Sequence, residues 1–330
     1  MGMRQMARMR RGVMTAALLA ATVTGSLVTG CTTHGRAVDD GRNRQQGHPE
    51  SQVSGSPSAT AGPVLAVKID NAGAARPQTG LDTADVVYAE QVEGGLSRLM
   101  AVFATNLPKT VGPVRSARES DLELLGQFHD PTLAFSGAQH KLLPLIDKAP
   151  LRAVSPEQDS NAYFRGGDKA APHNLFLRPK RLLNSAPGAD ALTTGFHFGA
   201  APPGGTPEKA RTVRFPAARF TFTWSEQRQR WLVSMDGTQA VTTDGATVAP
   251  ATVVVQHVKV RQSRFHDFLG SNTPYTETVG TGKAEVLRDG RVFDVDWQRK
   301  SATDGTEFTT ADGSPMNFAK GQVWVVFAKA

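Results

Sequence analysis

Cysteine is almost absent from this chain: a single one, Cys31, occurs in 330 residues. No disulfide can form within the chain, so its folded part must be stabilised by a hydrophobic core alone. The eight histidines are scattered without the spacing of metal ligands, and two of them, His34 and His48, lie in a polar segment. We therefore expect neither a metal site nor a cofactor.

Common catalytic signatures are missing as well. Gly95-Leu96-Ser97 lacks the second glycine of a nucleophile elbow, because position 99 is leucine. No Ser-x-x-Lys or His-Glu-x-x-His motif occurs, and Ala284 stands where a phosphate-binding loop at Gly282-Lys283 would need Ser or Thr. Hydrolysis by carboxylates stays open, because the fold sets their spacing. The carboxylates in question are Asp70, Glu90, Glu93 and Asp121.

No apolar run reaches the about 20 residues that cross a membrane as a helix. The nearest candidate, Val13 to Val28, is diluted by threonine and serine. It follows four arginines and ends in Leu27-Val28-Thr29-Gly30-Cys31. A charged start, an apolar middle and a small-residue cleavage site are typical of a bacterial secretory signal.

A cysteine at the first mature position, after Thr29 and Gly30, is the pattern that lipoprotein signal peptidase cleaves. We therefore predict a signal peptide at residues 1–30 and a diacylglycerol anchor, with palmitate-type acyl chains, on Cys31. This anchor would hold the protein at the cell membrane, on its extracytoplasmic face. The alternative is an ordinary signal peptide followed by a free thiol, which is a liability in an oxidising compartment.

The charge balance excludes another class of protein. The first 30 residues hold four arginines and no acidic residue, so their removal lowers the net charge from +7 to +3. A nucleic-acid-binding protein carries a much denser basic surface, and we expect no nucleic-acid partner. A local basic patch that faces anionic envelope polymers or lipid headgroups is still compatible with this charge.

The segment at residues 31–62 contains almost nothing that a core could bury. It is rich in Gly, Ser, Gln and Arg, which predicts a flexible tether behind the lipidated Cys31. Folded sequence begins at Pro63. A break rich in Pro and Gly, from Ser185 to Pro207, separates two predicted domains at residues 63–200 and 208–330.

The two predicted domains differ in their hydrophobic pattern. The first mixes strands with helical periodicity, with strands at 64–69, 86–88, 96–104 and 132–135 and helices at 116–128 and 138–146. The second has the pattern of strands alone, at 219–224, 230–235, 252–260, 282–287, 292–297 and 323–327. Arg288-Asp289-Gly290-Arg291 predicts a tight hairpin. The fold class is therefore α+β, a mixed α/β N-terminal domain followed by a mainly antiparallel β C-terminal domain.

Motifs in both domains resemble those of a bacterial lipoprotein family. They are Ile69-Asp70-Asn71, Ala75 to Leu81, Ala84 to Tyr88, Val92 to Arg98, Val111 to Arg118, Val253 to Gln256 and Gly280 to Ala284. This pattern, from residue 63 to 328, is similar to that of the YerB-like lipoproteins. The resemblance implies two consecutive domains of unknown function without an established activity. At Ala89 the chain departs from the family pattern, which has an acid there, so the carboxylate moves to Glu90 and to the other strand face.

Two arginines lie at the expected start of the helix at 116–128. Ser116 and Glu119 have the spacing of a capping box, with Ser116 as the N-cap, which puts Arg115 just before the helix and Arg118 in its first turn. Cations there oppose the helix dipole by about 0.3–1 kcal/mol each. One explanation is an anion, held by the helix N–H groups and by two guanidiniums. The other is a structural salt bridge, with Glu119, Asp121 or Asp85 as acceptor.

Further polar candidates follow strand ends or lie in glycine-rich loops. Such loops often place ligands in α/β domains, but an Asx turn explains Asp70-Asn71 and a hairpin turn explains Glu93-Gly94-Gly95 equally well. His173 and Asn174 form a polar pair at a cleft mouth or are simply solvated. The ligand-binding candidates are Asp70, Asn71, Arg76, Glu93, Arg98, Arg115, Ser116, Arg118, His173 and Asn174, and the catalytic candidates are Asp70 and Glu93.

Three hypotheses for the function follow. The leading one is a membrane-anchored binding or accessory lipoprotein of the cell envelope, which holds an anionic or glycan ligand in its α/β domain and contacts a protein partner through its β domain. The second is an envelope hydrolase or transferase that uses Asp70 and Glu93, and the third is a structural adaptor for a protein partner. Binding is favoured over catalysis. Convergence of the polar candidates on one open concavity would distinguish the first two hypotheses from the third.

Overall fold

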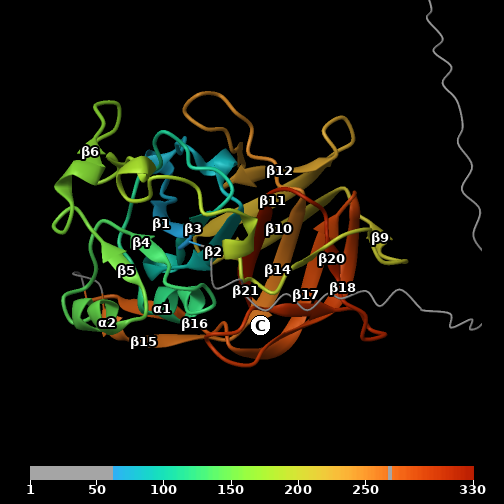
Figure 1. Cartoon of the computed structure of the whole chain (residues 1–330). Coiled ribbons are helices and arrows are strands. Elements are labelled where there is room, and N and C mark those ends of the chain that lie inside the picture. The colour runs from blue at the N-terminus through green and yellow to red at the C-terminus, as the bar shows by residue number, and fades with distance from the viewer. Residues whose placement is uncertain (1–61, 267–269) are drawn as a thin grey trace, which may run out of the picture. The chain divides into compact units, whose positions relative to one another are not determined.

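The computed structural model of the chain describes residues 62–266 and 270–330 (Figure 1). The predicted signal peptide, Cys31 and all but the end of the predicted tether lie outside these residues. Within the described part of the chain, no helix has the length and apolar character needed to cross a membrane.

Eleven strands form one mixed sheet at the centre of the fold. Its central strands are nearly continuous apolar runs, such as Val253-Val254-Val255, because both faces of the sheet are covered. In spatial order the strands are β19 (Glu307–Thr309), β18 (Arg291–Arg299), β17 (Gly280–Arg288), β14 (Thr252–Val258), β21 (Val323–Lys329), β2 (Val86–Gln91), β3 (Ser97–Phe103), β1 (Leu65–Asp70), β4 (Thr132–Ala134) and β5 (Arg152–Val154), with β9 (Thr206–Pro207) paired to β18.

The two predicted domains contribute to the same sheet. β21 runs parallel to β2, where Val86 lies beside Val323 and Ala89 beside Val326, and it runs parallel to β14 on its other side. All described residues belong to one compact unit. The boundaries at 63–200 and 208–330 stay a prediction about folding units, but the two segments share one sheet and both of its core layers.

The remaining strands form four smaller sheets. They are β10 (Ala210–Phe215), β11 (Ala218–Ser225), β12 (Arg230–Met235) and β13 (Thr238–Gln239) in one antiparallel sheet, and the pairs β15 (Val260–His266) with β16 (Asn272–Thr276), β6 (Tyr163–Arg165) with β7 (Leu175–Leu177), and β8 (His197–Phe198) with β20 (Asn317–Phe318). The four-stranded sheet covers one face of the main sheet. There, Phe220 and Phe222 of β11 meet the ring of Trp324 at centroid distances of 6.1 and 6.0 Å.

Two short helices, α1 (Glu119–Leu125) and α2 (Leu143–Lys148), cover the opposite face of the main sheet. Leu124 of α1 and Ile146 of α2 are buried in the same core cluster as Tyr88 of β2. Figure 1 shows both helices at the same side of the view as β15 and β16. The described residues are thus mostly strands with few helices, which agrees with the predicted α+β class, although the helical share is small.

α1 begins later than predicted. The backbone before it is extended, because the Arg115 N–H donates to the Lys68 carbonyl of β1 at 2.8 Å. Arg118 is the N-cap residue, and the Asp121 carboxylate accepts its N–H at 2.7 Å. The capping box predicted at Ser116 is therefore wrong: the helix is capped two residues further on by the Asp121 side chain alone, where the strand-like pairing of the backbone ends.

Two other local predictions have different outcomes. The second helix is displaced from 138–146 to 143–148, with Pro144 in its first turn, where a missing N–H costs no hydrogen bond. The hairpin at residues 288–291 is confirmed, since φ is 51° at Asp289 and 70° at Gly290. Positive φ at both central residues is typical of the type I′ turn, whose twist matches that of the strands.

Candidate ligand-binding site

Charged side chains gather where β1 and β2 end and β3 begins. Asp70 of β1 and Glu90 of β2 both lie opposite Arg98 of β3, so the three residues form one row on one face of the sheet. Lys68 lies two residues before Asp70 in β1 and shares this face. It is the face that α1 covers, so α1 and the segment before it determine what these charges contact.

Lys68, Glu90 and Asp121 form a buried group, which we call the Lys68 triad. The Lys68 ammonium donates to the Glu90 carboxylate and, at 2.6 Å, to Oδ1 of Asp121. The Ser120 hydroxyl donates to the second oxygen of Glu90 at 2.8 Å. Lys68 and Asp121 are 0% exposed and Glu90 is 4% exposed. The triad is therefore closed to solvent, and each of its charges has a partner.

The two carboxylates of the Lys68 triad differ in their pKa. Burial raises the pKa of Asp121 to about 6, with a further contribution from the Glu90 charge, and both outweigh the opposing effect of Lys68. Burial also acts to raise the pKa of Glu90, but the charge and hydrogen bond of Lys68 and the Ser120 hydroxyl lower it overall. Two carboxylates thus share one ammonium, and Asp121 is the one that takes up a proton first as the pH falls.

Asp70 is the centre of a second group of charges. Its Oδ2 lies 2.8 Å from Nδ1 of His173 and 3.3 Å from Nε of Arg115. Its Oδ1 accepts the Ala72 N–H at 3.1 Å, which confirms the Asx turn. Nε of Arg115 is buried and has no hydrogen-bond partner among the described residues, so Asp70 neutralises the guanidinium without satisfying it.

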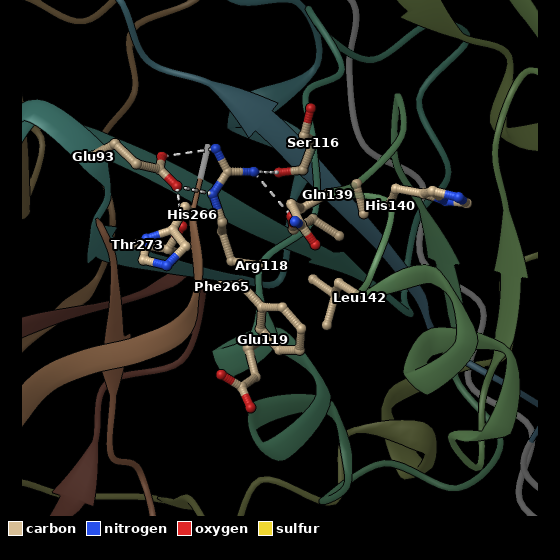
Figure 2. A pocket seen from close by; sticks show the side chains of 12 residues that line it. Glu93, Ser116, Arg118, Glu119, Gln139, His140, Leu142, Phe265, His266 and Thr273 are labelled. Carbon is tan, nitrogen blue, oxygen red and sulfur yellow. Dashed lines mark hydrogen bonds and ion pairs between the residues drawn. The ribbon is translucent and has the colours of Figure 1, made fainter. Parts of the chain in front are cut away.

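Arg118 forms a bidentate ion pair with Glu93 (Figure 2). Its Nε and Nη2 donate to the two carboxylate oxygens, each at 2.7 Å, and the Thr273 hydroxyl donates to the same carboxylate at 2.6 Å. Burial acts to raise the pKa of Glu93, but the hydrogen bonds and charge of Arg118, together with Thr273, lower it to about 2. Arg118 thus has the structural salt bridge, with Glu93 rather than Glu119, Asp121 or Asp85 as its acceptor.

Arg98 is the least neutralised cation of this region. Its Nη1 donates to the Ser116 carbonyl at 3.2 Å, and no carboxylate in the described part of the chain forms an ion pair with Arg98. Burial lowers the pKa of Arg98 to about 10; the charges of Arg118 and Arg115 act in the same direction, and those of Glu93 and Asp70 oppose it. Arg98, Arg115, Arg118, Asp70, Glu93 and His173 are called the arginine cluster below. Its three guanidiniums face two carboxylates, so it has an excess of positive charge.

Three of the predicted site residues make contacts of other kinds. Asn71 donates to the Ser97 hydroxyl at 2.9 Å. Arg76 donates to the Asp236 carboxylate at 2.8 Å, between β12 and β13, and lines a separate cavity of about 320 Å³. Asn174 accepts from Arg165 at 2.7 Å within the loop that joins β6 to β7. These contacts hold turns and loops in place and do not reach the arginine cluster directly.

A cavity of about 390 Å³ lies beside the arginine cluster (Figure 2). Its lining comes from both halves of the chain, namely Glu93, the segment at 116–119, residues Ala138, Gln139, His140 and Leu142, and Phe265, His266 and Thr273 of the β15–β16 hairpin. The Ser116 carbonyl, to which Arg98 donates, belongs to this lining. The cavity falls within the size range of small-molecule sites, about 300–1,000 Å³.

The predicted convergence of candidates is therefore partial. Glu93, Ser116 and Arg118 line the cavity, and Arg98 is linked to this lining through the Ser116 carbonyl, whereas Asp70, Arg115 and His173 do not line it. Glu93, with a pKa of about 2, is ionised at neutral pH and carries no proton to donate as a general acid. In the described ranges, no three His, Cys, Asp or Glu residues come together as a metal site. Lys68 was not among the predicted site residues, although a lysine inside the apolar run Val64 to Ile69 is a visible signal.

Two family models match the chain. Residues 51–192 match the N-terminal domain, and residues 211–325 the C-terminal domain, of a protein of unknown function (DUF3048). The chain is 25% identical over 271 residues to YerB of Bacillus subtilis (strain 168), which is named as a lipoprotein, and the match covers 79% of this chain and 80% of that protein. The crystal structure of YerB from Bacillus subtilis has a similar fold, with a TM-score of 0.68 at 20% identity over 87% of this chain and 97% of that chain.

Proposed function

Because the chain carries both DUF3048 domains and is homologous to the lipoprotein YerB, we propose that it is a membrane-anchored binding lipoprotein of the cell envelope that holds an anionic ligand at the arginine cluster. Cys31 is the proposed anchor point, and the extracytoplasmic face is the proposed location. A Cys31→Ser variant is expected in the soluble fraction, whereas the native chain is expected in the membrane fraction. If the variant and the native chain divided equally between the soluble and membrane fractions, the proposed anchor at Cys31 would be contradicted.

The observation that carries the ligand proposal is Arg98. A guanidinium removed from water is unfavourable unless a carboxylate or another anion compensates it. Among the described residues Arg98 has one carbonyl acceptor and forms no ion pair with a carboxylate; the charges of Arg118 and Arg115 lower its pKa, whereas those of Glu93 and Asp70 raise it. A bound anion would supply the direct ion-pair partner that Arg98 lacks, which favours the complex over the free protein.

The donors of the cluster have the right chemistry for an oxyanion. A guanidinium presents its N–H groups as a planar fork, which suits carboxylate, sulfate and phosphate oxygens. Arg118 has already used this fork on Glu93, whereas Arg98 and Arg115 have donors left over. The adjacent cavity gives room for the rest of a small ligand, with Phe265 and Leu142 as apolar surface and Gln139 as a polar group.

Hydrolysis by Asp70 and Glu93 is less well supported. Both carboxylates are engaged by cations, Asp70 by Arg115 and His173 and Glu93 by Arg118. The low pKa of Glu93 also removes it as a proton donor near neutral pH.

The test is a thermal-shift titration of the full chain, purified in a neutral detergent, with sulfate, phosphate and benzoate. A ligand at a hundredfold excess over its Kd stabilises the folded state by about 2.7 kcal/mol, so the melting temperature should rise. The rise should disappear in Arg98→Gln/Arg115→Gln. The matched control is Arg211→Gln, since Arg211 pairs with Glu208 and Glu285, which are not in the cluster, and it should respond like the native chain. An unchanged response of the double variant would refute the assignment.

A further inference from the structure

His173 is the one imidazole of the arginine cluster, and histidine is the residue type that normally changes its charge between about pH 5 and 8. It lies on the loop between β6 and β7, and its side chain is 22% exposed. Nδ1 is held by the Asp70 carboxylate at 2.8 Å. Nε2 is bonded to no described residue and is the nitrogen left for a ligand.

The charges around His173 come from three elements and from its own loop. Asp70 of β1 contacts it, Arg115 of the segment before α1 lies on the same carboxylate oxygen, and Arg98 of β3 lies opposite Asp70 in the sheet register. The charged residues of its own loop and the adjoining strand end are Arg165, which donates to Asn174, Lys169, which lies 6.0 Å from the Phe176 ring centroid, and Asp168.

The charge of this part of the cluster depends on the imidazole. Two guanidiniums, Arg98 and Arg115, face the single carboxylate of Asp70, which leaves one positive charge when the imidazole of His173 is neutral and two when it is protonated. A dianion therefore matches the protonated state better than a monoanion does. A phosphomonoester carries about −1.5 to −2 charge at pH 7 and offers three acceptor oxygens, one for each of the three cations.

We propose that the anionic group recognised by the arginine cluster is a phosphomonoester and that His173 makes its binding proton-linked. This rests on the proposed function, because it concerns the same site. Protonated His173 donates from Nε2 to one ligand oxygen, while Arg98 and Arg115 donate to the others. The phosphomonoester belongs either to a soluble molecule or to a lipid headgroup, and the two sources present the same chemistry to the cluster.

The experiment is calorimetric titration of the full chain in neutral detergent at pH 5.5, 7.0 and 8.5. Sulfate is the first probe, since it stays dianionic throughout and reports the protein's protonation alone. We expect the native chain to bind sulfate about tenfold more weakly at pH 8.5 than at pH 5.5, within the usual range of coupling between two sites. In His173→Gln the affinity should equal the native value at pH 8.5 and no longer change with pH.

The matched control is His129→Gln, because His129 is exposed, pairs with Asp130 and lies neither in the cluster nor in the lining of the cavity. It should keep the native pH dependence. Native-like sulfate binding by His173→Gln at pH 8.5 also demonstrates that this variant is folded. At pH 7.0, phenyl phosphate should bind at least about tenfold more tightly than benzoate, which has a single charge.

The outcomes distinguish this inference from the proposed function. Sulfate binding that does not change with pH, or that changes equally in His173→Gln, overturns the role of His173 while anion binding stands. Equal affinity for phenyl phosphate and benzoate overturns the phosphomonoester. No binding of any anion overturns both proposals. Competition of phosphatidic acid in mixed micelles with phenyl phosphate assigns the lipid headgroup as the source, and its absence assigns a soluble phosphomonoester.

Discussion

The Lys68 triad and the arginine cluster occupy the same face of the same three strands, yet they handle charge in opposite ways. In the triad, the charged groups are buried and bonded to a partner of the other sign, to a hydroxyl or to a backbone N–H. In the cluster, Arg98 has only a carbonyl, and Arg115 has a buried Nε without a hydrogen bond. The triad excludes water, whereas the cluster lies next to a cavity of about 390 Å³.

The difference indicates which charges serve the fold and which serve a ligand. A buried charge with a complete set of partners is bound to its neighbours, and removing one partner leaves the others unsatisfied. A guanidinium that forms no ion pair can be replaced without leaving a buried carboxylate unpaired. The number of partners left unsatisfied should therefore predict the cost of each substitution.

The largest effect is expected for Lys68→Met. The substitution leaves Glu90 and Asp121 buried without their cation, and breaking a buried ion pair in this way costs about 3–5 kcal/mol of unfolding free energy. Chemical denaturation in urea measures it. The triple variant Lys68→Met/Glu90→Gln/Asp121→Asn should recover most of the loss, because no buried charge remains. A loss below about 1 kcal/mol in the single variant would contradict the contrast between triad and cluster.

A smaller loss is expected for Glu93→Gln. It replaces two charge-assisted hydrogen bonds with Arg118 and should cost about 1.5–3 kcal/mol in the same measurement. The control is Glu277→Gln, because the Glu277 carboxylate pairs with Arg261 on the surface, where such pairs contribute about 0–1 kcal/mol. Equal losses of unfolding free energy in Glu93→Gln and Glu277→Gln would show that the buried Glu93–Arg118 pair stabilises the fold no more than a surface pair does.

The pH dependence should separate two carboxylates that differ in the sign of their pKa shift. Asp121 has its pKa raised from 3.8 to about 6, so the folded state binds the extra proton, and stability should rise by about 1–2 kcal/mol as the pH falls from 7 to 4. Glu93 has its pKa lowered from 4.5 to about 2, so its contribution is complete above pH 4.5 and is lost as the pH falls toward 2.

Urea denaturation from pH 7 to pH 3 measures both effects, each as the difference between the native chain and one variant. Relative to Asp121→Asn, the native chain should gain stability between pH 7 and 4. Relative to Glu93→Gln, it should lose stability only below pH 4.5. If the stability difference changed in the same direction with pH in both comparisons, the direction of one of the two pKa shifts would be wrong.

The smallest effect is expected for Arg98→Gln. No carboxylate loses its ion-pair partner, so the unfolding free energy should change by at most about 0.5 kcal/mol. Loss of the repulsion between Arg98 and the guanidiniums of Arg115 and Arg118 acts in the stabilising direction. Arg118→Gln is the comparison, because it leaves the Glu93 carboxylate without its cation. If Arg98→Gln were as damaging as Arg118→Gln, Arg98 would be a structural residue and the ligand proposal would lose its main support.

Strands were the most predictable part of this fold. Residues 64–69 and 323–327 are nearly continuous apolar runs, typical of strands buried on both faces, and residues 230–235 alternate, typical of a strand buried on one face. Strands form at all three places, with small shifts at their ends. The β15–β16 hairpin was not predicted. Its strand at 260–266 carries Arg261, Gln262 and Arg264 on exposed positions and has only short apolar alternation, so its conformation depends on packing against α1.

The candidate site was predictable by residue type and not by partner. Asp70, Glu93, Arg98, Arg115, Arg118 and His173 were all named from local patterns. The salt bridges were expected within or near the helix, but Glu93 comes from the turn between β2 and β3, and its second donor, Thr273, is 180 residues away. Lys68 and Glu90 face each other because β1 and β2 both pair with β3, and this register is a property of the sheet.

The position of β21 between β2 and β14 has a consequence for how the molecule is made. A ribosome releases the N-terminal strands first, yet β2 and β14 have no neighbour on one side until the last strand in chain order emerges. During synthesis, one edge of β2 and one edge of β14 stay unpaired until the same seven-residue segment, Val323–Lys329, is available. These edges can pair with other chains in the meantime. Export in an unfolded state, or a holding chaperone, would keep them apart until the sheet can close.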